Sequence, residues 1–228
     1  MNAYLGKLLH LSDPTLPIGG YSHSNGLETY VQHKIVKDDA STEAFVHNMI
    51  TNNILYNDAS FVKLAYEIAL NNDIKALVTL DQECAALKAP TEIKQASRKL
   101  GIRLQKIFDR QTTSPIIEEY QAAIASQDAE GHYSITFGLY AALFEIPLHE
   151  AVYAFLYNAA VGIVTNAVKL VPLSQLSGQD ILYKMQEVIQ STVPKVLALD
   201  RNLVGLCNIG FDIRCMEHEK LYSRLYMS

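Results

Sequence analysis

Cysteine is scarce in this sequence of 228 residues. The three cysteines, Cys84, Cys207 and Cys215, are odd in number and widely spaced, so they do not suit the disulfide framework of a small secreted domain. The opening residues also lack the basic stretch, apolar block and small-residue cleavage site of a signal peptide. These absences together predict a cytoplasmic protein.

The sequence also lacks the common short motifs of catalysis and nucleotide binding. It contains no G-x-x-x-x-G-K-[ST] loop for phosphates, no H-E-x-x-H or C-x-x-C pair for zinc, and no G-x-S-x-G nucleophile turn. We therefore expect neither a P-loop nucleotide site nor one of the commonest hydrolase or zinc sites, and we expect no cofactor.

Positive charge is limited as well. Lys and Arg number 19 against 24 Asp and Glu, which gives a net charge of -5, and no basic tract is visible along the chain. Affinity for nucleic acid depends on clustered Lys and Arg, so this composition argues against a nucleic-acid partner. A mildly acidic chain could still offer a local patch to a charged protein.

Helical patterns, by contrast, run along nearly the whole chain. Hydrophobic residues make up 49% of it, and the short alternating segments typical of strands are almost absent. Helix-start signals recur, such as Ser114 before Pro115 and the capping-box spacing of Ser177 and Asp180. We predict helices over 3–12, 23–35, 41–56, 58–71, 73–88, 92–111, 115–127, 133–145, 148–168, 178–191 and 194–202. With no linker between them, the predicted fold class is all-α, a single-domain helical bundle of about ten helices.

One segment, residues 151–168, carries no charge between Glu150 and Lys169. Its length is marginal for a membrane span, and polar residues such as Asn158 would be costly in lipid. We therefore predict a central buried helix and no membrane association.

The stretch DPTLPIGGYSHSNGLETY, residues 13–30, combines turn-forming prolines and glycines with hydroxyl groups, a histidine and a glutamate. Ser22 or Ser24 could cap the following helix, and the glycines could let another backbone approach closely, which would make the loop a docking surface. A third interpretation is a hydrolytic site of Ser22, His23 and Glu28, although neighbours in sequence are poorly placed as a nucleophile–base pair.

Later in the chain, His132, Gly138 and Lys169 stand out, and each has a structural interpretation. Gly138, in the middle of a predicted helix, indicates close packing of helices, and His132 suits a helix end. Lys169 ends the uncharged segment, where it suits either a helix C-terminus or the rim of an interface.

Residues 211–228 are expected to be a C-terminal partner-binding tail that belongs to the same domain as the all-α part over 1–210. Cys215 and His218 in this tail have the i, i+3 spacing that two ligands of one metal can use on a helix. Without further ligands the pair is a weak metal signal, and we predict no metal site.

The last part of this tail is rich in Leu, Tyr and Arg. Leu221 with Leu225, and Tyr222 with Tyr226, have i, i+4 spacing, which predicts a final helix. Tyr and Arg are frequent at the energetic centres of interfaces, so this helix is expected to dock either on its own domain or on a partner.

Taken together, these segments resemble one family, the urease accessory protein UreF. The resemblance covers most of the chain. It rests on LPIGGYSHSNGLE near the start, SRKLGIRL at 97–104, GHYSITFGL at 131–139, TNAVKLVPLSQ at 165–175, and the tail. The order and spacing of all these segments match the family, which is more specific than any single motif.

The resemblance implies a cytosolic, all-α homodimer that is not itself an enzyme. It implies an adaptor that links a UreD/UreH-type scaffold to the UreG GTPase on apo-urease and regulates GTP-dependent nickel insertion. The residues implied as partner-binding are Gly19, Gly20, Tyr21, Ser22, His23, Ser24, Gly26 and Glu28 in the loop, Lys169 and Gln175 at an interface rim, and Arg214, Met216, His218, Leu221, Tyr222, Arg224, Leu225 and Tyr226 in the tail.

Two alternatives stay open beside this one. The first is a small nickel-binding chaperone that uses His23, Cys215 and His218. The second is a Ser/His-dependent hydrolase that uses Ser22, His23 and Glu28.

Overall fold

Three helices form the centre of the molecule: α4 (Asp58–Leu70), α8 (Tyr133–Leu143) and α9 (Leu148–Leu170). The structure is a computed structural model that describes residues 3–228. Around the centre lie α1 (Leu5–Leu11), α2 (Leu27–Gln32), α3 (Asp39–Asn48), α5 (Ile74–Leu87), α6 (Thr91–Phe108), α7 (Pro115–Ala125), α10 (Gln175–Leu197) and α11 (Ile209–His218). Eleven α-helices and no strand occur within this range, which confirms the all-α prediction.

Gly138 lets the two central helices α4 and α8 touch backbone to backbone. A Cβ atom at this position would lie 2.4 Å from the carbonyl oxygen of Val62 and 3.0 Å from the Cβ of Ala65. A glycine inside a helix costs about 1 kcal/mol relative to alanine, so its presence here is explained by this close approach. The prediction of tight packing at Gly138 is confirmed.

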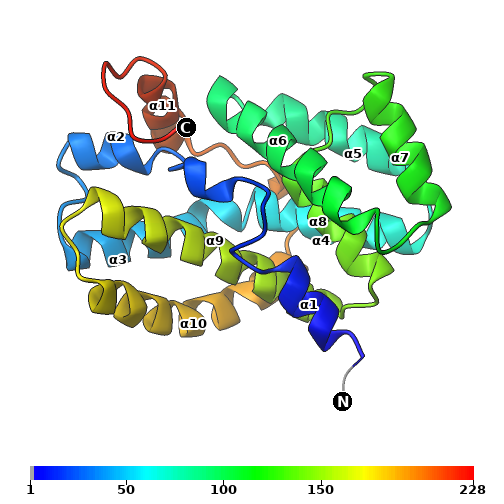
Figure 1. The fold of residues 1–228 in the computed structure, drawn as a ribbon, viewed down its shortest axis with the longest axis horizontal. Coiled ribbons are helices and arrows are strands. Elements are labelled where there is room, and N and C mark those ends of the chain that lie inside the picture. The colour runs from blue at the N-terminus through cyan, green and yellow to red at the C-terminus, as the bar shows by residue number, and fades with distance from the viewer. Residues whose placement is uncertain (1–2) are drawn as a thin grey trace.

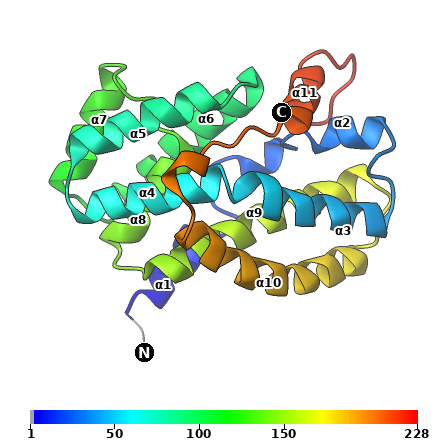
Figure 2. The ribbon, with the colours of Figure 1, turned by 180° about the vertical axis from the view of Figure 1, so that it is seen from behind.

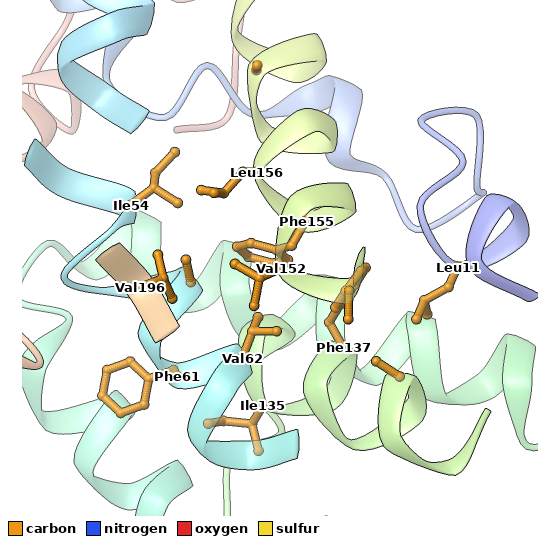
Figure 3. Close-up of a cluster of buried hydrophobic side chains, with 14 of the residues drawn as sticks. Leu11, Ile54, Phe61, Val62, Ile135, Phe137, Val152, Phe155, Leu156 and Val196 are labelled. Atoms are coloured by element: carbon orange, nitrogen blue, oxygen red, sulfur yellow. The ribbon is translucent and has the colours of Figure 1, made fainter. Parts of the chain in front are cut away.

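The uncharged segment forms most of α9, the core helix of the bundle. Figure 3 shows Val152, Phe155 and Leu156 of this helix facing Val62 of α4 and Ile54 of the short π-helix Met49–Ile54 that precedes α4. By length and composition α9 could cross a membrane, but 56% of its most apolar window is buried inside the protein. Packing of this kind is typical of a core helix and agrees with the predicted buried position.

The sequence-based prediction is wrong for α10, which is one helix instead of the two expected at 178–191 and 194–202. Pro194 lies inside it, in the last turn. Proline removes one helical hydrogen bond, but Val193 and Val196 on either side are fully buried, and their burial holds the turn in place. Figure 2 shows α10 alongside α3 on the side away from α6.

The start of α10 also differs from the prediction. Ser174 caps the helix by accepting a hydrogen bond of 2.9 Å from the backbone N–H of Ser177. The cap therefore lies three residues before the predicted capping box of Ser177 and Asp180. Ser177 is a first-turn residue, because its N–H is one of those left free at a helix start.

Candidate functional site

The opening loop crosses from α1 to α2 and is held at both of its left-handed glycines. At Gly19 φ is +88°, and the Arg103 guanidinium donates to the neighbouring Ile18 carbonyl at 2.9 Å. At Gly26 φ is +80°, and an added Cβ would lie 2.7 Å from the Sγ of Cys215. Both positions need glycine for conformation and for space. At Gly26 the element that approaches closely is α11 of the same chain.

Residues 219–228 are here called the terminal segment. The last residues of this segment run back along the opening loop. The Met227 N–H donates to the Ser22 carbonyl at 2.9 Å. The Ser228 carbonyl accepts from the Ser24 hydroxyl at 2.7 Å and from the Asn25 N–H at 3.0 Å. About 200 residues of chain separate these partners, so the loop and the terminal segment form one structural unit (Figure 1).

Glu28 is the buried anchor of this unit. Its carboxylate, in the first turn of α2, accepts from the backbone N–H of Leu225 at 2.8 Å and of Tyr226 at 3.2 Å. A ring nitrogen of His218 lies 3.1 Å from the same carboxylate. Glu28 is only 5% exposed, and a buried carboxylate must be hydrogen-bonded because its desolvation is costly.

His218 bridges this anchor to α6. Its Nε2 faces Glu28, and its Nδ1 lies 2.8 Å from a carboxylate oxygen of Glu92. The other oxygen of Glu92 forms an ion pair with Arg224. The ring is fully buried, so the last turn of α11, the first turn of α6 and the terminal segment are joined through two carboxylates.

The terminal segment is not helical, contrary to the prediction. Helix α11 ends at His218, and the backbone N–H groups of Leu225 and Tyr226 bond to Glu28 instead of to helical carbonyls. The pairs Leu221 with Leu225 and Tyr222 with Tyr226 therefore do not lie on one face of a helix. Tyr226 is buried, whereas Tyr222 and Leu225 point to solvent.

Six large apolar side chains of α11 and the terminal segment are exposed. We call this set the terminal face. It consists of Ile209, Ile213, Met216, Tyr222, Leu225 and Met227. Tyr222 and Leu225 are 106% and 66% exposed, and Tyr21 of the loop is also exposed, at 74%. Exposed apolar clusters of this kind are typical of binding surfaces.

The predicted rim residues lie elsewhere. Lys169 is in the last turn of α9 and Gln175 begins α10, both exposed. Within residues 3–228 neither forms a hydrogen bond or ion pair with the loop or the terminal segment. Asn166, one turn before Lys169, does make such a contact, because its side chain donates to the His23 carbonyl at 2.8 Å.

The groups of the hydrolase alternative are not arranged as a catalytic triad. The Ser22 hydroxyl donates to the Gly19 carbonyl at 2.8 Å, and the His23 ring shares a hydrogen bond of 2.8 Å with the Ser228 hydroxyl. Glu28 is engaged by the terminal segment. Nucleophilic catalysis needs the base bonded to the nucleophile and oriented by a third group, and the three residues do not have that order.

The metal alternative finds no support in the geometry of its ligands either. Among residues 3–228 no group of three or more His, Cys, Asp or Glu side chains could hold a metal ion. Cys215 packs against Gly26, where burial raises the pKa of its thiol well above the usual range and so disfavours the thiolate that binds metal. His218 has both ring nitrogens directed at glutamates.

The charge state of His23 is set by its surroundings. Burial lowers the pKa of its imidazole, and the nearby positive charges of Lys99 and Arg103 lower it further. A neutral ring is therefore favoured beside Ser228.

A cavity of about 240 Å³ lies between the loop, α6 and α9, and His23 is one of the residues that line it. The loop therefore covers part of an unfilled space.

Sequence reasoning did not identify Glu92, Arg103 and Asn166 as part of this site. Arg103 and Asn166 each make one contact to a loop residue, and Glu92 contacts His218 and Arg224 of the tail; all three act from helices far away in sequence. Glu92 and Arg103 follow ordinary amphipathic spacing on α6, so no local pattern distinguishes them. Arg103 lies in the segment SRKLGIRL at 97–104, and Asn166 lies in TNAVKLVPLSQ at 165–175. Membership of these family segments was the only signal in the sequence that could have indicated a role for the two residues.

The comparisons with known proteins agree on one family. The family model named UreF matches residues 36–186. The chain is 48% identical over 224 residues to a protein named urease accessory protein UreF from Actinobacillus pleuropneumoniae serotype 5b (strain L20), which covers 98% of this chain and 99% of that protein. It is 44% identical to the protein of the same name from Haemophilus influenzae (strain ATCC 51907 / DSM 11121 / KW20 / Rd), over 98% of this chain and 95% of the other. The protein of that name from Bacillus sp. (strain TB-90) is 33% identical over the full length of both chains.

Proposed function

The chain belongs to the UreF family of urease accessory proteins, and on this premise we propose that it is a cytoplasmic, non-catalytic adaptor in the activation of urease. Its partners would be a UreD/UreH-type scaffold, the UreG GTPase and apo-urease, and its action would regulate GTP-dependent insertion of nickel. Nickel in this scheme is cargo for the urease site.

One observation supports the proposal above the others. The side chains of the terminal face are exposed, while buried hydrogen bonds on the inner side fix the backbone of the terminal segment. Glu28 and His218 fix the backbone, so Tyr222 and Leu225 project outward without having to be ordered on binding. A partner that meets a preorganised surface loses less conformational entropy. We assign the scaffold to this face.

The GTPase would use a different mode of contact. A protein without a phosphate-binding loop can still influence a GTPase by placing polar or charged groups near its nucleotide. Lys169 and Gln175 are exposed at the turn between α9 and α10, and the proposal keeps them as candidate contacts for this partner. Of the loop residues, Tyr21 is exposed and available, whereas Ser24, Gly26 and Glu28 are buried and act by holding the surface.

The terminal face is tested by co-purification with the scaffold protein. The double substitution Tyr222→Arg and Leu225→Arg removes two exposed apolar anchors, and we expect at least a tenfold loss of scaffold affinity. The matched control is Leu176→Arg with Tyr183→Arg on α10, which alters one leucine and one tyrosine that are also exposed, at 77% and 75%. Unchanged scaffold binding by the Tyr222/Leu225 variant would contradict the assignment.

Dimerisation and the role in urease activation need their own measurements. A homodimer would sediment at twice the chain mass of 25.4 kDa. In cells lacking the native protein, the Lys169→Ala variant should fold normally but restore less nickel-loaded urease. If the Lys169→Ala variant restored nickel-loaded urease as fully as the wild-type chain, Lys169 would no longer belong to the proposal.

A further inference from the structure

Helix α6 carries a concentration of positive charge that the linear sequence hides. Six of the chain's 19 Lys and Arg residues lie within 94–110, on α6 and the turn that follows it: Lys94, Arg98, Lys99, Arg103, Lys106 and Arg110. Apolar residues interrupt them, so no basic tract is visible in the sequence. A local concentration of positive charge therefore exists although the sequence shows no unbroken basic tract.

These six residues divide into two groups. Lys94 and Arg98 share an ion pair with the single carboxylate of Glu130, at 3.0 and 3.2 Å. The other four have no carboxylate within salt-bridge distance anywhere in residues 3–228: Lys99, Arg103, Lys106 and Arg110. All four are exposed. Lys99, Arg103 and Lys106 are spaced four and three residues apart, which puts them on one face of α6, and Arg110 follows in the turn after the helix. We call these four residues the α6 stripe.

The stripe is a costly arrangement for the free protein. Like charges three or four residues apart on a helix repel one another, and this chain has more acidic than basic residues with which they could have been paired. Lys94 and Arg98 on the same helix are paired in this way. The unpaired state of the stripe is therefore a feature that folding alone does not account for.

One member of the stripe is held in place by the opening loop. Arg103 donates through one Nη atom to the Ile18 carbonyl at 2.9 Å. Gly19 makes room for it, since a Cβ at that position would lie 2.2 Å from the same nitrogen. The guanidinium keeps its other donors free and is still exposed, so it is preorganised for an anionic partner.

The surroundings of the stripe restrict the kind of partner. Every exposed large apolar residue in the described chain lies outside 91–125, so α6 offers no apolar anchor for a lipid surface. From Lys99 to Lys106 the helix rises by roughly 10 Å, and Arg110 lies in the turn beyond its end. Nucleic acid would bring dense phosphate charge against the rest of a chain whose net charge is -5, which disfavours it.

We propose that the α6 stripe binds an acidic protein segment, with carboxylates spaced to meet Lys99, Arg103, Lys106 and Arg110. Carboxylates three or four residues apart on one face of a partner helix match this spacing. The stripe differs from the terminal face in composition, and the inference does not depend on the adaptor role proposed above.

The probe for this proposal is a fluorescein-labelled 16-residue glutamate-rich peptide, measured by fluorescence anisotropy in 50 mM salt with the full chain. The test variant is Lys99→Gln, Lys106→Gln and Arg110→Gln together. The control variant, Lys37→Gln, Lys75→Gln and Lys195→Gln, removes the same charge from other exposed sites. We expect saturable binding that weakens at least tenfold in the test variant and less than twofold in the control.

Three outcomes would overturn the proposal. They are equal weakening in both variants, no saturable binding of the peptide at all, or tighter binding of a labelled 16-base-pair DNA duplex than of the peptide. Circular dichroism establishes that both variants stay helical. The Tyr222→Arg, Leu225→Arg variant should bind the acidic peptide at least as tightly as the wild-type chain, because it keeps the stripe and adds positive charge, so failure of the adaptor proposal and failure of this one give different results.

Discussion

The terminal face and the α6 stripe are both exposed, but they are built in opposite ways. The terminal face has apolar side chains on a backbone that buried hydrogen bonds fix through Glu28. The stripe has charged side chains on α6 and the turn after it, and within residues 3–228 only Arg103 among them is hydrogen-bonded to another element. The first surface depends on burial and order, whereas the second depends on charge. Changes that release the terminal segment should therefore affect only the terminal face, and changes in charge or salt should affect mainly the α6 stripe.

The largest effect is expected for Glu28→Ala. The substitution leaves two backbone N–H groups and the Nε2 of His218 without their partner, and each buried unsatisfied group costs about 1–3 kcal/mol. The terminal segment should relieve this by leaving the loop. Hydrogen exchange of residues 224–228 should then accelerate at least a hundredfold, while α6 exchanges as before. Retained protection in the segment would show that Glu28 is not its anchor.

A smaller effect on the same surface is expected for Gly26→Ala. The new Cβ would lie 2.7 Å from Cys215 Sγ, at a φ of +80° that alanine disfavours. We expect a loss of about 1–3 kcal/mol in unfolding free energy, measured by urea denaturation. Gly162→Ala is the matched control, because a Cβ there meets nothing within 4 Å and the residue lies inside α9. It should be neutral or stabilising.

Salt should separate the two surfaces without any mutation. Exposed charges are screened over about 8 Å at physiological ionic strength, so peptide binding to the stripe should weaken several-fold between 50 and 200 mM NaCl. The scaffold binding proposed for the terminal face would be driven by apolar burial and should change less than twofold. Similar salt dependence for the two partners, measured by titration calorimetry, would mean that they use the same kind of surface.

The smallest effect concerns the electrostatic link between the stripe and the loop. Lys99 is one cause of the lowered pKa of His23, so Lys99→Gln should raise that pKa, whereas Lys75→Gln should not. NMR titration of the imidazole measures both. A histidine whose pKa is lowered by folding takes up protons more readily when unfolded, so its contribution to stability falls as pH drops below its ordinary value of 6.5. Lys99→Gln should lessen this loss.

Local patterns were sufficient for most of the fold. Helical periodicity and start signals located the helices, and Gly138 was correctly interpreted because a mid-helix glycine is destabilising unless it permits a close approach. The prediction failed at Pro194, where tertiary burial of Val193 outweighs a local breaker, and at Leu221–Tyr226, where an apparent helical repeat is overridden by Glu28.

The site was less accessible to sequence reasoning than the fold. Glu28 was singled out, but its partners lie nearly 200 residues away, and no periodicity reports a contact at that separation. The α6 stripe was missed for another reason. Charge was considered along the chain, whereas the relevant pattern is the i, i+4, i+7 spacing around a helix. Lys99 and Arg103 lie inside the segment SRKLGIRL, which was interpreted as a family motif and not as a set of charges.

The different environments of the thiols have a practical use. Cys84 and Cys215 are buried, and burial raises the pKa of the Cys84 thiol to about 12, whereas Cys207 is exposed just ahead of α11. A maleimide dye should therefore attach to the wild-type chain at Cys207 alone. A fluorophore there would stand beside the terminal face, where its emission could follow the arrival of a binding partner in real time.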